Sequence, residues 1–148
     1  MHFSRLKDED VTTEQYLRYA QELKVEADES NKTTELANAF RLYEELKVKE
    51  GRADYADLIS WTLKLFRTRP AILGRYQKQF KYVLIDEFQD TNFAQNALAI
   101  LLAGKKKNIT VVGDDDQAIY RWRGAAIANI IQFRKTFPKA KIVVLTKN

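Results

Sequence analysis

Apolar positions in the first half of the chain recur at the three- and four-residue spacing that is typical of amphipathic helices. A helix is expected after Thr12, where Thr-Thr-Glu-Gln has the form of a capping box. A second helix is expected from near Thr33 to a stop at Gly51. Asp54 is placed to cap a third helix, and Pro70 fits the first turn of a short fourth helix. The pattern therefore predicts that the first half is entirely helical.

The pattern changes in the second half of the chain. Three short apolar runs follow one another, at residues 82–85, 108–113 and 141–145. The continuous apolar character of the first two is typical of strands that are buried on both faces. A helix capped by Asn92 and ended by Gly104 is expected between the first two runs, and a helix over residues 125–136 before the third. Alternation of strands and helices indicates parallel β-α-β units, so the fold class is α/β, with a boundary that separates residues 1–78 from residues 79–148.

Composition and charge narrow the classes of protein. The chain has 148 residues, 45% of them hydrophobic, and no cysteine, which excludes a disulfide scaffold and a thiolate metal site. Its apolar runs are much shorter than the ~20 residues of a membrane span, so we expect a soluble, cytoplasmic protein. The first 76 residues carry 13 basic and 14 acidic side chains, whereas the remaining 72 carry 12 and 6. This basic second half suits a polyanionic partner.

Acidic side chains in the basic half follow two apolar runs directly. Asp86 and Glu87 end the first run, and Asp114 is the first of three aspartates that end the second. Ligands of parallel α/β sheets bind beyond the carboxyl ends of the strands. A strand that ends in Asp-Glu has the form of a Walker B element, in which one carboxylate holds Mg²⁺ and the next activates a water. Taken alone, such a pair is more often a helix cap or a solvated strand end, so the longer strings decide the interpretation.

Two strings resemble motifs of the UvrD/Rep-type superfamily 1 DNA helicases. Residues 83–92, VLIDEFQDTN, resemble helicase motif II, and residues 111–125, VVGDDDQAIYRWRGA, resemble motif III. Residues 51–59, GRADYADLI, look like the helical lead-in to motif II, and residues 145–148 look like the opening of motif IV. We expect the similarity to run from about residue 50 to the end of the chain. The order and separation of the two long strings make coincidence an inadequate explanation.

The resemblance implies a role for each matching residue. Asp86 would coordinate Mg²⁺, and Glu87 would act as the catalytic base. Asp114 is expected at the nucleotide site for a different reason, because it ends the second strand. Gln117 would contact the γ-phosphate of ATP as a second catalytic residue. Single-stranded DNA would contact the side chains that the motif III string supplies, namely Tyr120, Trp122 and Arg123. Aromatic rings and arginines suit this partner because stacking on bases tolerates any sequence.

The resemblance also implies that parts of the helicase lie outside this chain. No Gly-x-x-x-x-Gly-Lys-Ser/Thr phosphate loop occurs in it. The expected fold is therefore a partial RecA-like parallel sheet of the P-loop NTPase type, without its P-loop strand. Residues 1–78 would be part of a helical insertion subdomain, and residues 79–148 the second half of the first motor domain. Unpaired sheet edges would favour homo-oligomers.

The expected function is that of a fragment of an ATP-dependent DNA helicase or translocase, with the 3′→5′ polarity that the family implies. Its partners would be ATP, single-stranded DNA and the remaining parts of the helicase, and the chain alone would be inactive. One alternative is a non-catalytic module that binds protein or DNA. A metal-dependent nuclease is a weaker alternative, because no lysine or histidine accompanies the acids at the spacing typical of nucleases.

Overall fold

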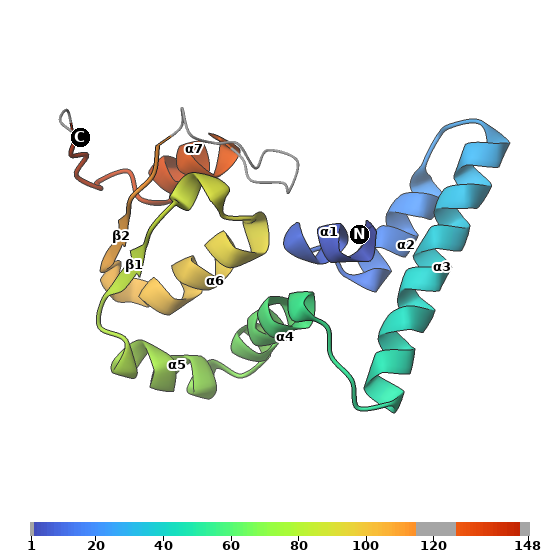
Figure 1. The fold of residues 1–148 in the computed structure, drawn as a ribbon, viewed down its shortest axis with the longest axis horizontal. Coiled ribbons are helices and arrows are strands. Elements are labelled where there is room, and N and C mark those ends of the chain that lie inside the picture. The colour runs from blue at the N-terminus through green and yellow to red at the C-terminus, as the bar shows by residue number, and fades with distance from the viewer. Residues whose placement is uncertain (1, 115–126, 146–148) are drawn as a thin grey trace.

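The computed structural model describes residues 2–114 and 127–145 (Figure 1). The helices and strands among them are α1 (His2–Asp8), α2 (Thr13–Glu22), α3 (Ala27–Lys49), α4 (Tyr55–Thr68), α5 (Pro70–Gln79), β1 (Val83–Ile85), α6 (Phe93–Ala103), β2 (Ile109–Val111) and α7 (Ile127–Thr136), with 3₁₀ turns η1 (Phe88–Asp90) and η2 (Gly104–Lys106). None of the described helices combines the length and the apolar character needed to cross a membrane.

Capping boxes begin three of the described helices; the sequence predicted the box at Thr12 and predicted caps at Asp54 and Asn92. The side chains of Thr12, Asp54 and Asn92 each accept a hydrogen bond from the backbone N–H of the residue three positions later. The side chain of that later residue in turn accepts a hydrogen bond from the backbone N–H of the capping residue. Each box satisfies donors that the first helical turn leaves without intrahelical partners. The predicted helix ends at Gly51 and Gly104 are also confirmed. Each glycine lies just after the end of a helix, α3 or α6, and itself has a positive φ.

The expected start of the second helix near Thr33 is wrong. Helix α3 begins at Ala27 instead, and its first turn carries Asp28 and Glu29, whose charges suit the positive end of the helix dipole. The hydroxyl of Thr33 donates to the carbonyl oxygen of Glu29 at 2.9 Å, so this residue lies inside the helix rather than capping it. Helices α2 and α3 form an antiparallel hairpin (Figure 1). Tyr16 and Phe40 are buried in this hairpin.

Strands β1 and β2 pair in parallel, and α6 forms the crossover between them. Val83 is opposite Ile109, and Ile85 is opposite Val111. Hydrogen bonds extend the pairing past the strands, from the Val112 N–H to the Ile85 oxygen and from the Phe88 N–H to the Val112 oxygen, each at 2.8 Å. The parallel arrangement and the mixed α/β character agree with the predicted fold class, although the described residues are mostly helical and the sheet has two strands.

One face of this small sheet carries its core. Ile85, Ile109 and Val111 pack against a buried cluster of aromatic rings, formed by Phe88, Phe133 and Phe137. On the other face Leu84 is 76% exposed. The prediction that β1 is buried on both faces is therefore wrong, because no described element covers the second face.

The predicted third strand at residues 141–145 is also absent from the described structure. These residues lie outside any helix or strand, and Ile142, Val143, Val144 and Leu145 are 62–80% exposed. A strand is held by hydrogen bonds to a neighbouring strand. Among the described residues β2 pairs with β1 alone, so its other edge is not joined to this segment.

Helices from the first half of the chain pack on the crossover helix. Helix α4 contacts both α5 and α6, and α1 contacts both α4 and α6. The Asn92 side chain, which caps α6, also donates to the Asp8 carboxylate at 2.7 Å. Figure 1 shows α1 and α4 between the α2–α3 hairpin and the part of the chain that holds the sheet.

Candidate functional site

The sheet places the predicted acidic residues at one of its edges. Asp86 and Glu87 directly follow β1, and Asp114 follows β2 after Val112 and Gly113. Because the two strands are adjacent and parallel, their carboxyl ends lie side by side at the edge where α/β proteins bind ligands. We call Asp86, Glu87 and Asp114 the strand-end acids.

A buried glutamine connects the two strand ends. Gln89 is 1% exposed, and its Nε2 donates to the Glu87 Oε2 at 2.6 Å. Its Oε1 accepts the backbone N–H of Asp114 at 2.9 Å. The partners determine the orientation of this amide, because a carboxylate accepts hydrogen bonds and a backbone N–H donates them. We call this arrangement of Glu87, Gln89 and Asp114 the amide bridge.

Gly113 makes room for the amide bridge. A Cβ atom built on Gly113 would lie 2.7 Å from the Gln89 Oε1 and 3.3 Å from the Gln89 backbone nitrogen. Real Cβ contacts are not as short as the first of these distances, so any larger residue would displace the amide. Glycine at this position therefore reflects a close approach between the two strand ends.

The backbone at Glu87 is in the left-handed region, with φ 49° and ψ 44°. A residue with a Cβ atom adopts this conformation at a cost of about 1–2 kcal/mol, and such residues are enriched at functional sites. Asp86 Oδ1 accepts the Glu87 N–H at 3.0 Å, and the following Phe88 is buried in the aromatic cluster. The turn thus leaves Asp86 and Glu87 exposed while the chain after them is anchored in the core.

The strand-end acids are suitable ligands for a hard cation, but they do not form a closed cage. Among the described residues, the group of acids whose oxygens all lie within 4.8 Å is a different one, Glu44, Asp54 and Asp57. Mg²⁺ is commonly held by one or two carboxylates, with water and substrate phosphates completing its shell. The strand-end acids fit that arrangement, in which Asp86 would supply a carboxylate oxygen.

The Glu44, Asp54 and Asp57 group is paired with two lysines, which occupy the position that a metal ion would take. Lys7 and Lys47 each form ion pairs with all three acids, at 2.6–3.1 Å, and both lysines are buried. We call these five residues the ionic cluster. It joins α1, α3 and the start of α4, so its role is structural.

The ionic cluster changes the proton affinity of Asp54, Asp57 and Lys47. Burial alone raises the pKa of Asp57, but hydrogen bonds from Lys47 and Lys7 outweigh burial and lower the pKa below its ordinary value of 3.8. The same opposition lowers the pKa of Asp54, where Tyr43 also donates. For Lys47, burial lowers the pKa, but the bonds to Asp57 and Glu44 dominate and raise it. Asp54, Asp57 and Lys47 are therefore charged near neutral pH.

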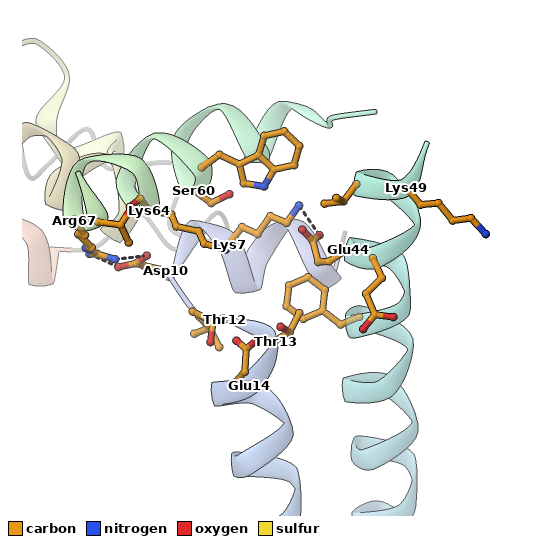
Figure 2. Close-up of a pocket in the computed structure, with 16 residues that line it drawn as sticks. Lys7, Asp10, Thr12, Thr13, Glu14, Glu44, Lys49, Ser60, Lys64 and Arg67 are labelled. Carbon is orange, nitrogen blue, oxygen red and sulfur yellow. Dashed lines mark hydrogen bonds and ion pairs between the residues drawn. The ribbon is translucent and has the colours of Figure 1, made fainter. Parts of the chain in front are cut away.

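A cavity of about 700 Å³ lies between the α1–α2 turn, α3 and α4. Figure 2 shows the residues that line it. Part of its charged lining is paired, since Lys7 contacts Glu44 at 2.8 Å and Arg67 contacts Asp10 at 2.6 Å. None of the strand-end acids lines it. The cavity is therefore separate from the candidate site.

The structure describes three of the predicted site residues. It brings Asp86, Glu87 and Asp114 to one edge of the sheet. The other four predicted residues lie outside the described residues, namely Gln117, Tyr120, Trp122 and Arg123. Gln89 was part of the motif II string, but sequence reasoning gave it no role. Its partner at Asp114 is 25 positions away, and no local pattern reports such a contact.

Comparison with known protein families and sequences supports the resemblance. The model of the UvrD/REP helicase N-terminal domain matches residues 1–138, so the similarity begins at the first residue and not near residue 50 as expected. The chain is 45% identical over 113 residues to a protein of Leuconostoc citreum named ATP-dependent DNA helicase PcrA, with 76% of this chain and 15% of that protein covered. Proteins of the same name from Staphylococcus aureus strain Mu50 and Bacillus subtilis strain 168 are 43% and 44% identical, over 86% and 76% of this chain.

These matches cover only a small part of the relatives. The chain spans 15–18% of the length of these three PcrA proteins. The family match nevertheless extends over most of the chain and includes the strand-end acids and the amide bridge. The chain therefore belongs to the UvrD/REP helicase family, in which it corresponds to part of the N-terminal domain.

Proposed function

We propose that this chain supplies the hydrolytic half of an ATP site in an ATP-dependent DNA helicase or translocase. The observation that carries the proposal is the meeting of Asp86, Glu87 and Asp114 at the ends of adjacent parallel strands. Family membership and the printed name of the relatives, ATP-dependent DNA helicase PcrA, support the same reaction. The remainder of the helicase would complete the site, because the chain contains no phosphate loop.

Each strand-end acid has a distinct proposed role. Mg²⁺, when bound, would neutralise charge on the β- and γ-phosphates of ATP. Asp86 would hold this ion directly or through water, and Asp114 would lie beside it. Glu87 would accept a proton from the water that attacks the γ-phosphate, which its exposure to solvent allows. Gln117, from the motif III resemblance, would contact the γ-phosphate.

The same resemblance supports a DNA site close to the nucleotide site. Tyr120 and Trp122 would stack on bases of single-stranded DNA, and Arg123 would contact its backbone. These residues follow the strand-end acids closely in sequence, so one segment would connect hydrolysis with movement along DNA. We assign the movement the 3′→5′ polarity of the family.

The fold assignment is part of the proposal. The β1–α6–β2 crossover would be the second half of a RecA-like motor domain within residues 79–148, and residues 1–78 would be part of the insertion subdomain. The open edge of β2 would pair with a strand from the rest of the helicase. In isolation, this edge would favour self-association. Light scattering that shows a monomer at high protein concentration would contradict the self-association.

Nucleotide binding is the direct test of the proposal. Mg²⁺-ATP at ten times its dissociation constant should raise the free energy of unfolding by about 1.4 kcal/mol. Asp86→Asn should abolish the increase, whereas Asp28→Asn, at an exposed acid on α3, should preserve it. Absence of any stabilisation in the parent at millimolar nucleotide would favour the non-catalytic alternative, and Mg²⁺-dependent DNA cleavage would favour the nuclease.

Two further measurements address catalysis and DNA binding. The isolated chain should show no ATP turnover, and turnover that disappears in Glu87→Gln would contradict this expectation. Fluorescence titration with single-stranded DNA should detect weak binding that decreases between low and high salt. Trp122→Ala should weaken this binding, and equal affinity of variant and parent would contradict the role of Trp122.

A further inference from the structure

We propose that Gln89 is a positioning residue for the nucleotide site, one whose amide fixes the Glu87 carboxylate relative to the chain that leaves β2. This inference rests on the proposed function, in which Glu87 acts as the base. Its structural basis is the amide bridge, with distances of 2.6 Å to Glu87 and 2.9 Å to Asp114. Gln89 itself does not act on the nucleotide.

The burial of Gln89 makes the bridge specific. The side chain is 1% exposed, and a buried amide that loses its partners pays the full cost of its desolvation. Both ends of the amide are satisfied here, one by each strand end. The amide is therefore held in one orientation, and the two strand ends are held with it.

The bridge restricts the catalytic carboxylate in a useful way. Glu87 is exposed and its side chain has several rotatable bonds, so without a tether it would sample many orientations. The amide holds Oε2, which leaves Oε1 as the oxygen that accepts a proton. Precise placement of a general base is a requirement for proton transfer.

The other end of the bridge holds the start of the segment that leads to Gln117. Asp114 directly follows Gly113, and its backbone N–H donates the hydrogen bond to the Gln89 Oε1. Gly113 is an independent sign of this contact, because a Cβ there would lie 2.7 Å from the Gln89 Oε1. One side chain thus connects the proposed base with Asp114, the first residue of the segment that continues in sequence toward Gln117.

The inference can be tested by NMR on the full chain without nucleotide. Gln89→Met should increase the exchange rate of the Asp114 amide about tenfold, as the loss of one hydrogen bond implies. The same variant should shift the side-chain carboxylate carbon of Glu87. Gln89→Glu should shift that carbon while preserving the Asp114 hydrogen bond, because a carboxylate accepts but does not donate. This second variant retains the shape of the side chain if Gln89→Met fails to fold.

Gln77→Met provides a matched control. Gln77 donates its Nε2 to the Leu101 carbonyl oxygen at 2.7 Å, so among the described residues it is a structural amide that bonds a backbone carbonyl and not a carboxylate. This variant should leave the Glu87 and Asp114 signals unchanged. An Asp114 exchange rate in Gln89→Met within twofold of the parent, or an unshifted Glu87 carbon, would overturn the inference.

Titration with Mn²⁺ separates this inference from the proposed function. In the parent, Mn²⁺ should broaden the signals of Asp86, Glu87 and Asp114 together, and in Gln89→Met the broadening of Asp114 should fall at least twofold relative to that of Asp86. Equal broadening in both proteins would overturn the positioning role. Absence of broadening in the parent would instead count against the proposed metal site, whereas the bridge itself is measured without metal.

Discussion

Removal of the Asp57 carboxylate should strongly destabilise the protein. This side chain is fully buried and accepts four hydrogen bonds, two from Lys47 at 2.6 and 2.8 Å, one from Lys7 at 2.6 Å and one from the Asp54 N–H at 2.7 Å. Removing one partner of a buried ion pair commonly costs 3–5 kcal/mol, because the other partner stays buried and poorly compensated. Glu44 and Asp54 would still neutralise the lysines, so we expect the lower end, about 3 kcal/mol, for Asp57→Ala.

Urea denaturation followed by far-UV circular dichroism measures this loss. The matched control is Glu45→Ala, which removes an exposed ion pair to Arg41 on α3 and should change the free energy of unfolding by no more than about 0.5 kcal/mol. In both variants the free energy of unfolding should fall with urea concentration at the same slope as in the parent, so that a change in the midpoint reports a change in stability. If Asp57→Ala lost less than about 1 kcal/mol, the reasoning from burial and hydrogen bonding would be refuted.

Three other outcomes are expected. The pKa values of Asp54 and Asp57 are lowered in the folded state, so their contribution to the free energy of unfolding is present above their ordinary pKa and is lost as the pH falls. The free energy of unfolding should therefore decrease between about pH 5 and pH 2 in acid titrations. Asp57→Ala should flatten that decrease. Gly113→Ala should lower the free energy of unfolding by about 1–3 kcal/mol in urea denaturation, because the added Cβ would meet the Gln89 amide. The control Gly74→Ala, in helix α5, has no heavy atom within 4 Å of the added Cβ and should raise the free energy of unfolding by about 0.5–1 kcal/mol. Equal effects of the two substitutions would contradict the close approach at the strand ends. Glu87→Gly should be more stable than Glu87→Ala by about 1 kcal/mol in the same assay, since glycine adopts the left-handed conformation freely, and equal stability would contradict backbone strain there.

Features fixed by neighbouring residues could be predicted from the sequence. The helix caps at Thr12, Asp54 and Asn92 bond to residues three positions later, so the local pattern was enough to predict them. The same holds for the strands that end in acids, because the change from apolar to acidic residues is local. Parallel pairing of β1 and β2 followed from the helix between them.

Features that depend on distant residues could not be predicted in this way. Lys7 is 50 positions from Asp57, and a lysine in a charged segment is ordinarily expected to be solvated. Residues 141–145 have the composition of a strand, but a strand exists only when a neighbour accepts its hydrogen bonds. The exposure of Leu84 has the same origin, since burial of the second face requires an element that the described residues do not supply.

The ionic cluster and the strand-end acids have different roles, but helix α6 connects them through its contacts. The cluster fixes α1 to α3 and α4, and both α1 and α4 pack on α6. The cap of α6 is tied to α1 by the hydrogen bond from Asn92 to Asp8. Since α6 is the crossover that joins β1 to β2 and packs on both strands, the helical part of the chain supports the edge of the sheet that carries Asp86 and Asp114. A two-stranded sheet alone is marginally stable, so this support is what allows the strand ends to hold a defined geometry.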